Sequence, residues 1–240
     1  ADKCHLMICK QNQNEFLVNL NDKVIENENT VELLGITIDS NLKFNEHISK
    51  LFKKENQKPH VLARISKFMN QDKLKILMKT FITTQFNYYP LVWMFTNRTL
   101  NNKINRLHER ALRLVYKDDN LSFGQLLKKD KSVSVHHRNL QRLAIEMYKV
   151  KNNLAPKPFQ ELFTLKNNRY DFRNKKTWET NNIRTCIYGY ETVSNMGPKI
   201  WELLPENIKS LDTLQQFRLR IKFWIPEKCP CKLCQIYVQI

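Results

Sequence analysis

The sequence predicts a mostly α protein with a small antiparallel β element at its N-terminus. The first observation is a change of period in the hydrophobic pattern. Over residues 1–39 apolar side chains alternate with polar ones, as in strands, whereas beyond Asn41 they recur every three or four residues, as in helices. The second observation is composition, because 4 glycines in 240 residues are too few for an all-β fold with many tight turns.

Two stretches make up the predicted β element. The stretch EFLVNLNDKVIE is typical of a hairpin, with Asn21 and Asp22 at its turn. The stretch VELLGITID is a β-branched apolar run around Gly35. A glycine inside a strand pattern indicates a bulge or the close approach of another backbone, and an ordinary core strand is the alternative.

Helical periodicity begins with the stretch FNEHISKLF, in which the apolar residues of 44–52 share one face. Pro59 interrupts the pattern, and we expect a kink or a break there. Asn70 is positioned to cap the next helix, QDKLKILMKTFITTQF, at its N-terminus. Pro90 then fits the first turn of a further helix in YYPLVWMF.

The segment 101–117 carries the strongest helical pattern in the chain. Its apolar residues Ile104, Leu107, Ala111 and Leu114 recur at helical spacing and make the predicted buried stripe. A basic stripe lies roughly 100° around the same helix and consists of Lys103, Arg106, Arg110, Arg113 and Lys117. A face of one sign can follow a phosphate backbone without reading bases, and a solvated helix face is the alternative.

A second amphipathic helix is predicted in the stretch HHRNLQRLAIEMYKVKNNL. Its inward positions are Leu140, Leu143, Ala144, Met147 and Val150. Arg138 and Arg142 lie on the predicted outer face, and they are weaker candidates for phosphate contact because Glu146 shares that face. Further on, GPKIWELLP predicts a short helix that starts at Gly197-Pro198, and SLDTLQQFRLRIKFWIP predicts a last amphipathic helix.

The charge balance predicts an anionic partner. Lys and Arg number 40 against 23 Asp and Glu, a formal net charge of +17, which favours nucleic acid, with solubility alone as the alternative. No apolar run reaches the roughly 18 residues of a membrane span. Cys usage indicates reduced thiols rather than a disulfide scaffold. We therefore expect an intracellular protein of the nucleus or the cytoplasm, without membrane contact.

The stretch LVYKDDN carries a tyrosine, one residue and two aspartates, the order found in the metal-binding hairpin of some polymerases. Two-metal chemistry needs carboxylates from separate elements, and this pair should sit at the tip of a tight hairpin. Here Tyr116 ends a helix, and Lys117 completes the basic stripe and would be costly in a buried strand. We therefore predict that Asp118 and Asp119 form a helix terminus and turn with no catalytic role.

The tail sequence CPCKLC has the spacing C-x-C-x-x-C, made by Cys229, Cys231 and Cys234. Thiolates this close can share one Zn²⁺, but a tetrahedral structural site needs a fourth ligand. No His or Cys follows in the sequence, and the fourth ligand would come from His136, His137, Cys186 or another part of the protein. The alternative is a set of reduced thiols on a frayed tail.

Seven stretches carry a family resemblance when taken together and in order. They are ADKCHLMI, LLGITIDSNLKFNEHISKL, TQFNYYPLVWMF, LNNKINRLHERALRLVYKDDNLSF, NLQRLAIEMYKVKNNLAPKP, GPKIWELLP and CPCKLC. They resemble the C-terminal part of reverse transcriptases from jockey-like non-LTR retrotransposons (LINEs), over nearly the whole chain. The resemblance implies the end of a palm and a primer-grip-like β hairpin in residues 1–42, a thumb-like helical bundle in 43–117, and a mainly helical C-terminal region with a Cys-rich tail in 118–240.

The resemblance implies a parent protein that is an RNA-directed DNA polymerase, with the element's RNA as template, cut target DNA as primer and Mg²⁺ as cofactor. The family's catalytic aspartates match no position of this chain. The chain also opens at Ala1 in a strand pattern without an initiator Met. We therefore expect a fragment that binds template–primer but does not polymerise, with the remainder of the parent polyprotein as a further partner.

The resemblance also assigns individual positions. Lys3 matches the lysine of the last palm motif, a position linked in polymerases to protonation of pyrophosphate, and Leu34 and Gly35 would lie near the primer end. Pro59 stands where the family usually has leucine, and a proline inside a helix costs about 3 kcal/mol unless the helix already breaks there. Two other functions stay open, namely a non-enzymatic basic helical nucleic-acid-binding protein with a zinc-stapled tail and an inert transposon remnant.

Overall fold

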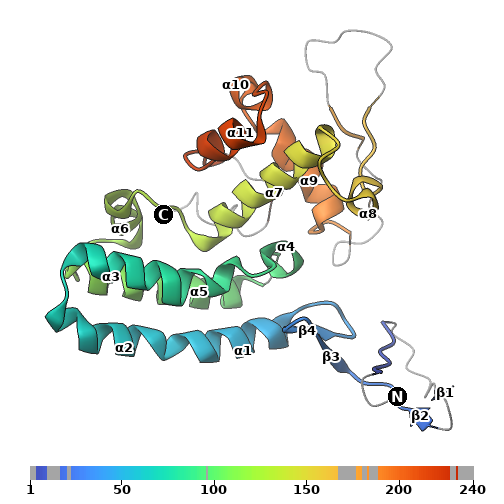
Figure 1. Ribbon diagram of the computed structural model, residues 1–240, viewed down its shortest axis with the longest axis horizontal. Helices are drawn as coiled ribbons and strands as arrows, with labels where there is room; N and C mark the ends of the chain where they lie inside the picture. The colour runs from blue at the N-terminus through green and yellow to red at the C-terminus, as the bar shows by residue number, and fades with distance from the viewer. Residues whose placement is uncertain are drawn as a thin grey trace. The chain divides into compact units, whose positions relative to one another are not determined.

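The computed structural model describes residues 4–9, 17–20, 23–95, 97–166, 177–179, 183, 189–227 and 231. It confirms a mostly α chain with two small antiparallel strand pairs near the N-terminus (Figure 1). The chain divides into two compact units. The first holds Ala1–Tyr88 and Thr96–Asp119, and the second holds Tyr89–Phe95 and Asn120–Ile240.

Both strand pairs are hairpins. β1 (Val18–Leu20) pairs antiparallel with β2 (Lys23–Ile25), which confirms the first predicted hairpin. β3 (Thr30–Leu33) pairs with β4 (Ile36–Asp39), with Leu33 opposite Ile36. The alternation near Leu6 does not make a strand, because the described residues there form only an isolated bridge to Asn27.

The turn between β3 and β4 corrects the prediction for Gly35. Gly35 does not lie inside a strand but in a two-residue turn, with φ of 50° at Leu34 and 76° at Gly35. Positive φ at both central residues is the mark of a type I′ turn, whose twist matches that of the two strands. The glycine is therefore used for its backbone conformation and not for a bulge.

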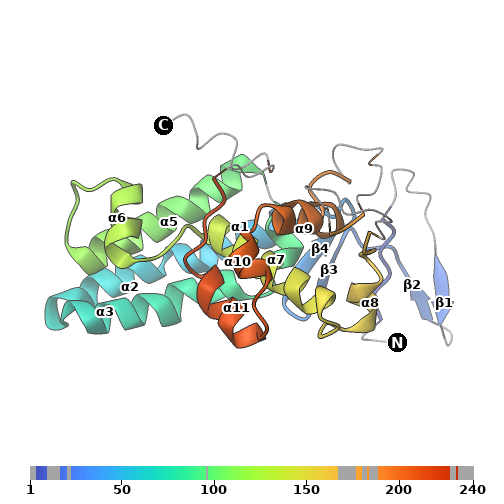
Figure 2. The ribbon, with the colours of Figure 1, turned by 90° about the horizontal axis from the view of Figure 1, so that it is seen from above.

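The first unit is built mainly from helices. Its helical segments are α1 (Asn45–Asn56), α2 (Lys58–Ile65), η1 (Ser66–Phe68), α3 (Gln71–Met78), η2 (Lys79–Thr83), η3 (Gln85–Asn87) and α5 (Arg98–Tyr116). Figures 1 and 2 together show α3 and α5 side by side across the same face of α1 and α2. The break predicted at Pro59 is confirmed, because Pro59 is the second residue of α2. Its missing N–H is not needed there.

Short polar contacts fix the chain between the hairpin and the helices. Asp39, at the end of β4, accepts backbone N–H groups from Asn41 and Lys43 at 3.1 Å and from Phe44 at 2.6 Å. Asn70 caps α3 as predicted, with its side chain accepting the N–H of Lys73 at 3.1 Å. Asn70 thus satisfies a donor that the first turn of a helix leaves unpaired, whereas Asp39 fixes the turn that leads into α1.

The core of the first unit lies where α5 meets α1, α2 and α3. Ile104, Leu107 and Ala111 are buried as predicted, but Leu114 is only half-buried. Leu112 and Val115 are buried in addition. The buried face is wider than the predicted stripe because α5 packs against several helices instead of one neighbour.

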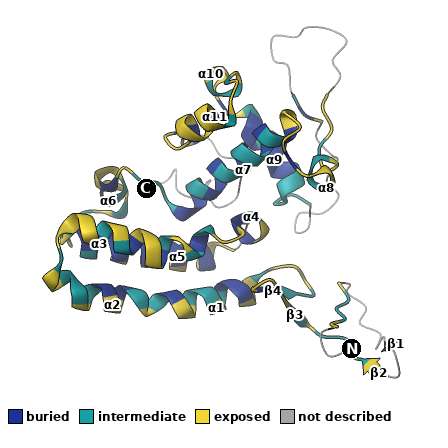
Figure 3. Ribbon diagram, viewed as in Figure 1, coloured by how far each residue is buried: buried dark blue, intermediate teal, exposed yellow. Residues whose placement is uncertain are grey.

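The second unit is arranged around one long helix. Its helices are α4 (Pro90–Trp93), α6 (Phe123–Asp130), α7 (Val135–Lys151), α8 (Lys157–Gln160), α9 (Val193–Glu202), α10 (Glu206–Lys209) and α11 (Leu214–Ile221). α7 is covered along nearly its whole length (Figure 3), and it contacts α4, α9 and α11. Tyr148, Trp201 and Phe217 fill the core beside it, with the Trp201 and Phe217 rings stacked at 6.1 Å between centroids. All five predicted inward positions of α7 are buried.

The start of α9 corrects another prediction. The helix does not begin at Gly197-Pro198 but at Val193, with Thr192 as its cap accepting the N–H of Asn195 at 3.4 Å. Gly197 and Pro198 therefore lie inside the helix. A Cβ at Gly197 would stand 2.6 Å from Met147 Sδ, and the glycine is what lets α9 approach α7 closely.

Candidate nucleic-acid interface

The basic stripe of α5 lies on the outside of the first unit. Four of its five cations are exposed, and Arg113 is half-buried. Asn97 begins the helix by accepting the N–H of Leu100 at 2.9 Å, and Lys117 ends it in the left-handed conformation, with φ of 50°. One uninterrupted helix therefore presents Lys103, Arg106, Arg110 and Arg113, and Lys117 follows as its C-cap.

Contacts with the neighbouring helices place the stripe along the edge of α1 and α2. Lys103 Nζ lies 5.9 Å from the centroid of the Phe52 ring. Arg110 donates to Asn56 Oδ1 at 3.4 Å, and its Nη2 lies 3.1 Å from His60 Nε2. Figure 1 shows α5 running alongside α1 and α2, which it contacts.

The five cations differ in the hydrogen bonds and ion pairs that they already make with neighbouring residues. Arg113 donates to Glu109 Oε1 at 2.8 Å and also to the backbone carbonyl of Asp119. Arg106 and Lys117 make no hydrogen bond or ion pair with any residue that the structure describes. Arg106, between Lys103 and Arg110, and Lys117 are therefore the cations with the most freedom to meet an anion.

The segment after α5 does not form the tight β-hairpin that carries paired aspartates in a polymerase. α5 ends at Tyr116, residues 118–120 form no strand, and the carbonyl of Asp119 accepts from Arg113. Nowhere in the described part of the chain do three Asp, Glu, His or Cys side chains gather as metal ligands. The prediction that Asp118 and Asp119 form a helix terminus and turn is confirmed. The Asp pair does not fit the Mg²⁺ site of a polymerase, which draws its carboxylates from separate elements.

The β3–β4 turn borders a polar pocket of about 210 Å³, which we call the hairpin pocket. Its lining residues include Gly35, Thr37, His47, Lys50, Lys54 and Tyr88. Tyr88 holds the turn by donating its hydroxyl to the carbonyl of Leu34 at 2.8 Å. Burial first, and the nearby Lys50 second, lower the pKa of His47, and its neutral imidazole accepts the N–H of Thr37 at 3.3 Å.

Charge at the hairpin pocket is mixed, with Glu32 on the β3 side and Lys50 and Lys54 on the α1 side. Lys50 donates to Thr37 Oγ1 at 3.4 Å and pairs with Glu46 at 2.9 Å. Lys54 is one turn further along α1 and exposed. Leu34 is 71% exposed beside them, in the left-handed conformation that costs a leucine free energy. Backbone strain and exposed apolar surface beside a polar pocket are features of a contact site.

The two arginines of α7 are placed differently from the predicted outer face. Arg138 is half-buried and its Nη1 is enclosed without a hydrogen-bond partner among the described residues. Burial first, and repulsion from Arg142 second, lower the pKa of Arg138, while Asp130 raises it. Arg138 is therefore partly enclosed and does not lie on an open outer face.

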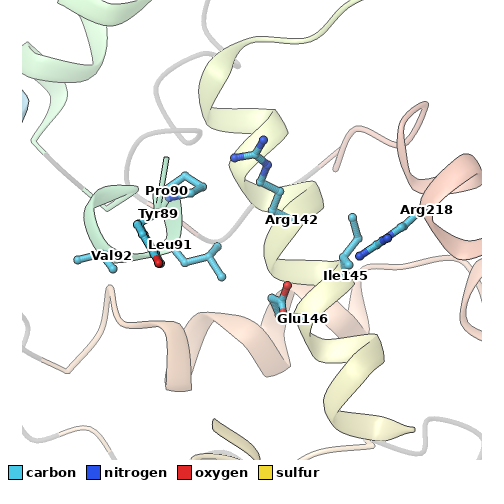
Figure 4. A pocket seen from close by; sticks show the side chains of 8 residues that line it. All are labelled: Tyr89, Pro90, Leu91, Val92, Arg142, Ile145, Glu146 and Arg218. Atoms are coloured by element: carbon cyan, nitrogen blue, oxygen red, sulfur yellow. The ribbon is translucent and has the colours of Figure 1, made fainter. Parts of the chain in front are cut away.

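Arg142 lines an apolar pocket of about 420 Å³ in the second unit (Figure 4). Its walls are formed by Arg142, Ile145 and Glu146 of α7 and by Arg218 of α11. Residues 89–92 complete the lining. Glu146 also accepts from Lys149 at 2.7 Å. Mixed charge around apolar walls does not favour a nucleic-acid contact at Arg142.

Three predicted positions, Lys3, Cys229 and Cys234, lie outside the described residues. Cys231 is described, and it is fully buried with its Sγ 3.1 Å from His136 Nε2. Of the candidates for a further ligand, His136 contacts Cys231, and Cys186 lies outside the described residues. None of the helices that the structure describes combines the length and apolar character needed to cross a membrane.

Sequence reasoning missed the residues around the hairpin pocket. Lys50 and Lys54 are spaced four residues apart on α1 and could have been found as a short basic face. His47 carries no such signal, because its position depends on how α1 packs against β4. The sequence likewise gave no signal for Asn56 and His60, which contact Arg110, because a contact between separate helices leaves no local sequence pattern.

Known proteins give no direct assignment for this chain. Comparison with protein-family models, with curated proteins and with solved structures found no match. A role therefore has to be argued from the basic surface of α5, from the hairpin pocket and from the stretches that carry the resemblance.

Proposed function

We propose that the chain binds the RNA–DNA duplex of template and primer, as the C-terminal part of a jockey-like non-LTR retrotransposon reverse transcriptase. The observation that carries the proposal is the exposed, single-sign stripe on α5. In this proposal residues 43–117 are a thumb that holds the duplex behind the active site of the parent polymerase. The catalytic aspartates match no position of this chain, and the chain alone binds without polymerising.

The stripe suits a duplex backbone rather than base edges. From Lys103 to Lys117 it extends about 21 Å at the rise of an α-helix, and a strand carries a phosphate about every 3.4 Å. The exposed cations can therefore each meet a different phosphate. A polymerase must hold every sequence it copies, and backbone contacts carry no sequence information.

The hairpin pocket is the second part of the proposed interface. Leu34 and Gly35 would contact the primer end, with the exposed leucine against its terminal sugar. Lys50 and Lys54 would neutralise the adjacent phosphates. A rigid type I′ turn suits this task because its position is fixed by Tyr88 as well as by the strands.

The test is a salt-titrated binding measurement on an RNA–DNA duplex. We expect Arg106→Glu combined with Arg110→Glu to weaken binding on the order of tenfold or more at low salt. The slope of log affinity against log salt should fall by about 2 units, because each lost phosphate contact removes about 0.9. Fluorescence anisotropy with a labelled duplex gives both quantities.

A matched double variant controls for net charge. Lys73→Glu combined with Lys79→Glu makes the same change of charge at exposed positions of the first unit, on α3 and η2. We expect this variant to keep most of the affinity and of the salt slope. Equal losses in both double variants would mean that total charge, and not the stripe, drives binding.

One alternative shares the interface. A non-enzymatic, basic helical nucleic-acid-binding protein with a zinc-stapled tail is favoured by the contact of His136 with Cys231. The coding sequence directly upstream of Ala1 separates the two proposals. An in-frame hairpin with Tyr-x-Asp-Asp supports the polymerase, and its absence supports the alternative. A folded chain without duplex affinity would instead support an inert transposon remnant.

A further inference from the structure

The second unit holds an apolar pocket that the proposed function does not use, and we call it the α7 pocket. Its volume is about 420 Å³, which lies within the usual range of ligand pockets, about 300–1,000 Å³. Its lining comes from residues 89–92, from α7 and from α11. All of these residues belong to the second unit, so the α7 pocket lies within one compact body.

The walls of the α7 pocket are largely apolar and continue onto the surface. Pro90 is buried, Leu91 and Ile145 are half-buried, and Figure 4 shows Leu91 pointing toward α7. Val92 is 45% exposed and Tyr89 is 51% exposed. A ligand that fills the pocket also covers these exposed side chains. An extended polypeptide segment covers such a rim better than a compact small molecule does.

The backbone at the rim of the α7 pocket is strained. Tyr89, the residue before α4, has the left-handed conformation with φ of 39° and ψ of 48°. This conformation is unfavourable for a bulky residue with a Cβ atom. Strained positions that the surrounding structure maintains cluster at ligand-binding sites. The strain is therefore a second observation, independent of the cavity, that indicates a contact at this rim.

Two guanidinium groups flank the apolar walls. Arg218 is exposed and makes no hydrogen bond or ion pair with any residue that the structure describes. Arg142 is half-buried, and burial lowers its pKa because the charged form has lost part of its hydration. Glu146, the carboxylate of the lining, already pairs with Lys149 at 2.7 Å. An anionic group at this rim would therefore meet two cations and compensate the partial burial of one of them.

We propose that the α7 pocket binds a segment of a partner protein in which one large apolar side chain is flanked by Asp or Glu residues. The apolar side chain enters the pocket between Leu91 and Ile145, and the flanking carboxylates pair with Arg142 and Arg218. An apolar anchor in a pocket with charged pairs at the rim is a common arrangement in peptide recognition. No residue of α5 or of the hairpin pocket takes part, so this binding is separate from duplex binding.

Charge and shape favour an acidic peptide over a nucleic acid. A single strand carries a phosphate at every nucleotide and is bound along a continuous positive groove. Here the two arginines lie on separate helices, and Glu146 lies one helical turn from Arg142. The Glu146 carboxylate would repel a backbone of closely spaced phosphates. A peptide avoids this repulsion, because a neutral residue can occupy the position beside Glu146.

The test is fluorescence anisotropy with the full chain and labelled ten-residue peptides. Each peptide carries one Trp, Phe or Leu anchor among Asp, Glu, Ser and Gly. We expect at least one anchor to give a Kd of about 1–100 μM at low salt. Replacing that anchor with Ala should weaken binding about tenfold or more. Replacing the acidic residues with Lys should abolish binding, and added salt should weaken it. No binding of any of these peptides up to about 1 mM would overturn the proposal.

Matched variants locate the contact on the protein. Arg218→Glu should weaken peptide binding about tenfold. Arg220→Glu makes the same change of charge at an exposed position of α11 about 200° around the helix, outside the lining, and should change the affinity little. Val92→Ser should weaken binding about threefold or more, because it removes apolar wall. Leu219→Ser, at a 60% exposed position outside the lining, is its control.

The remaining outcomes distinguish other occupants. Equal losses in Arg218→Glu and Arg220→Glu would mean that total charge drives binding, and this would overturn the proposal. Free N-acetyltryptophan that binds as tightly as the peptide would assign the pocket to a small carboxylate. A single-stranded oligonucleotide that displaces the peptide, and whose own affinity falls in Arg218→Glu but not in Arg220→Glu, would assign it to nucleic acid. Peptide binding should persist in the double variant Arg106→Glu with Arg110→Glu, which separates this result from that for the duplex.

Discussion

At the scale of single residues, the cations of this protein fall into two groups, those that contribute to the fold and those that are free to contact a ligand. Some cations contribute to the fold. Arg113 donates to Glu109, and Arg138 is partly enclosed in the second unit. Others, such as Arg106, face outward without a described partner. The sequence predicted the basic stripe from spacing alone, but it could not predict this division, because it depends on which helices pack nearby.

The turn between β3 and β4 was not predicted, because the hydrophobic pattern of the sequence continues through Leu34. Two-residue hairpin turns with positive φ usually read Asn-Gly or Asp-Gly, whereas this one reads Leu34-Gly35. A leucine in the middle of an apolar run is typical of a strand, and the predicted strand therefore ran through the turn. Gly35 carried the only signal, and it fits a bulge equally well.

We expect Leu34→Asn to stabilise this hairpin. Asn tolerates the left-handed conformation far better than Leu, for which it costs about 1–2 kcal/mol. Little burial is lost, since Leu34 is 71% exposed. The free energy of local opening, measured by hydrogen exchange of the β3 and β4 amides, should rise by about 1 kcal/mol.

Leu33→Asn is the matched control for that variant. Leu33 is 58% exposed and lies in β3, where Asn is disfavoured. This variant should lower hairpin protection. If Leu34→Asn lowered it as well, the turn would not be strained. A Leu34→Asn chain that is more protected but binds duplex more weakly would show that the strained leucine serves the interface.

At the scale of elements, periodicity predicted where helices occur better than where they begin. α5, α7 and α11 lie where their apolar spacing placed them. α9 begins before the predicted start because a Gly-Pro pair reads as a boundary, although here it lies inside the helix. The deciding contact is the approach of α9 to Met147, which no local pattern contains.

Two helical glycines make a direct comparison of this contact. Gly197→Ala should destabilise the second unit by about 1–2 kcal/mol, because its Cβ would stand 2.6 Å from Met147 Sδ and 3.1 Å from Phe163 Cε1. Gly124→Ala in α6 meets nothing within 4 Å and should stabilise by up to about 1 kcal/mol. Denaturant unfolding followed through the tryptophans of the second unit measures both changes.

A double-mutant cycle assigns the cost to one atom pair. In a Met147→Ala background the sulfur is absent, and Gly197→Ala should then lose most of its destabilising effect. Purely additive effects would place the cost in the helix backbone instead of in the contact between α7 and α9.

At the scale of the whole molecule, the short helix α4 belongs to a different unit from the residues that flank it in the sequence. Residues 89–95 belong to the second unit, although residues 1–88 and 96–119 form the first. The domain boundaries predicted from the sequence, after residues 42 and 117, did not place residues 89–95 in the second unit. Hydrophobic period predicts that a helix has a buried face, but it contains no information about which core the face joins.

Two methionines test this division of the chain. Met94 is 2% exposed and packs in the core of the second unit, whereas Met78 is 1% exposed in the first. Each substitution by Ala should cost about 2–5 kcal/mol in the core it belongs to. Hydrogen exchange should therefore show lost protection in α7, α9 and α11 for Met94→Ala, and in α1, α3 and α5 for Met78→Ala. Two identical exchange patterns would mean that the chain unfolds as one cooperative body. Distinct patterns would mean that each unit holds its own stability, and that a duplex bound to α5 protects the first unit without the second.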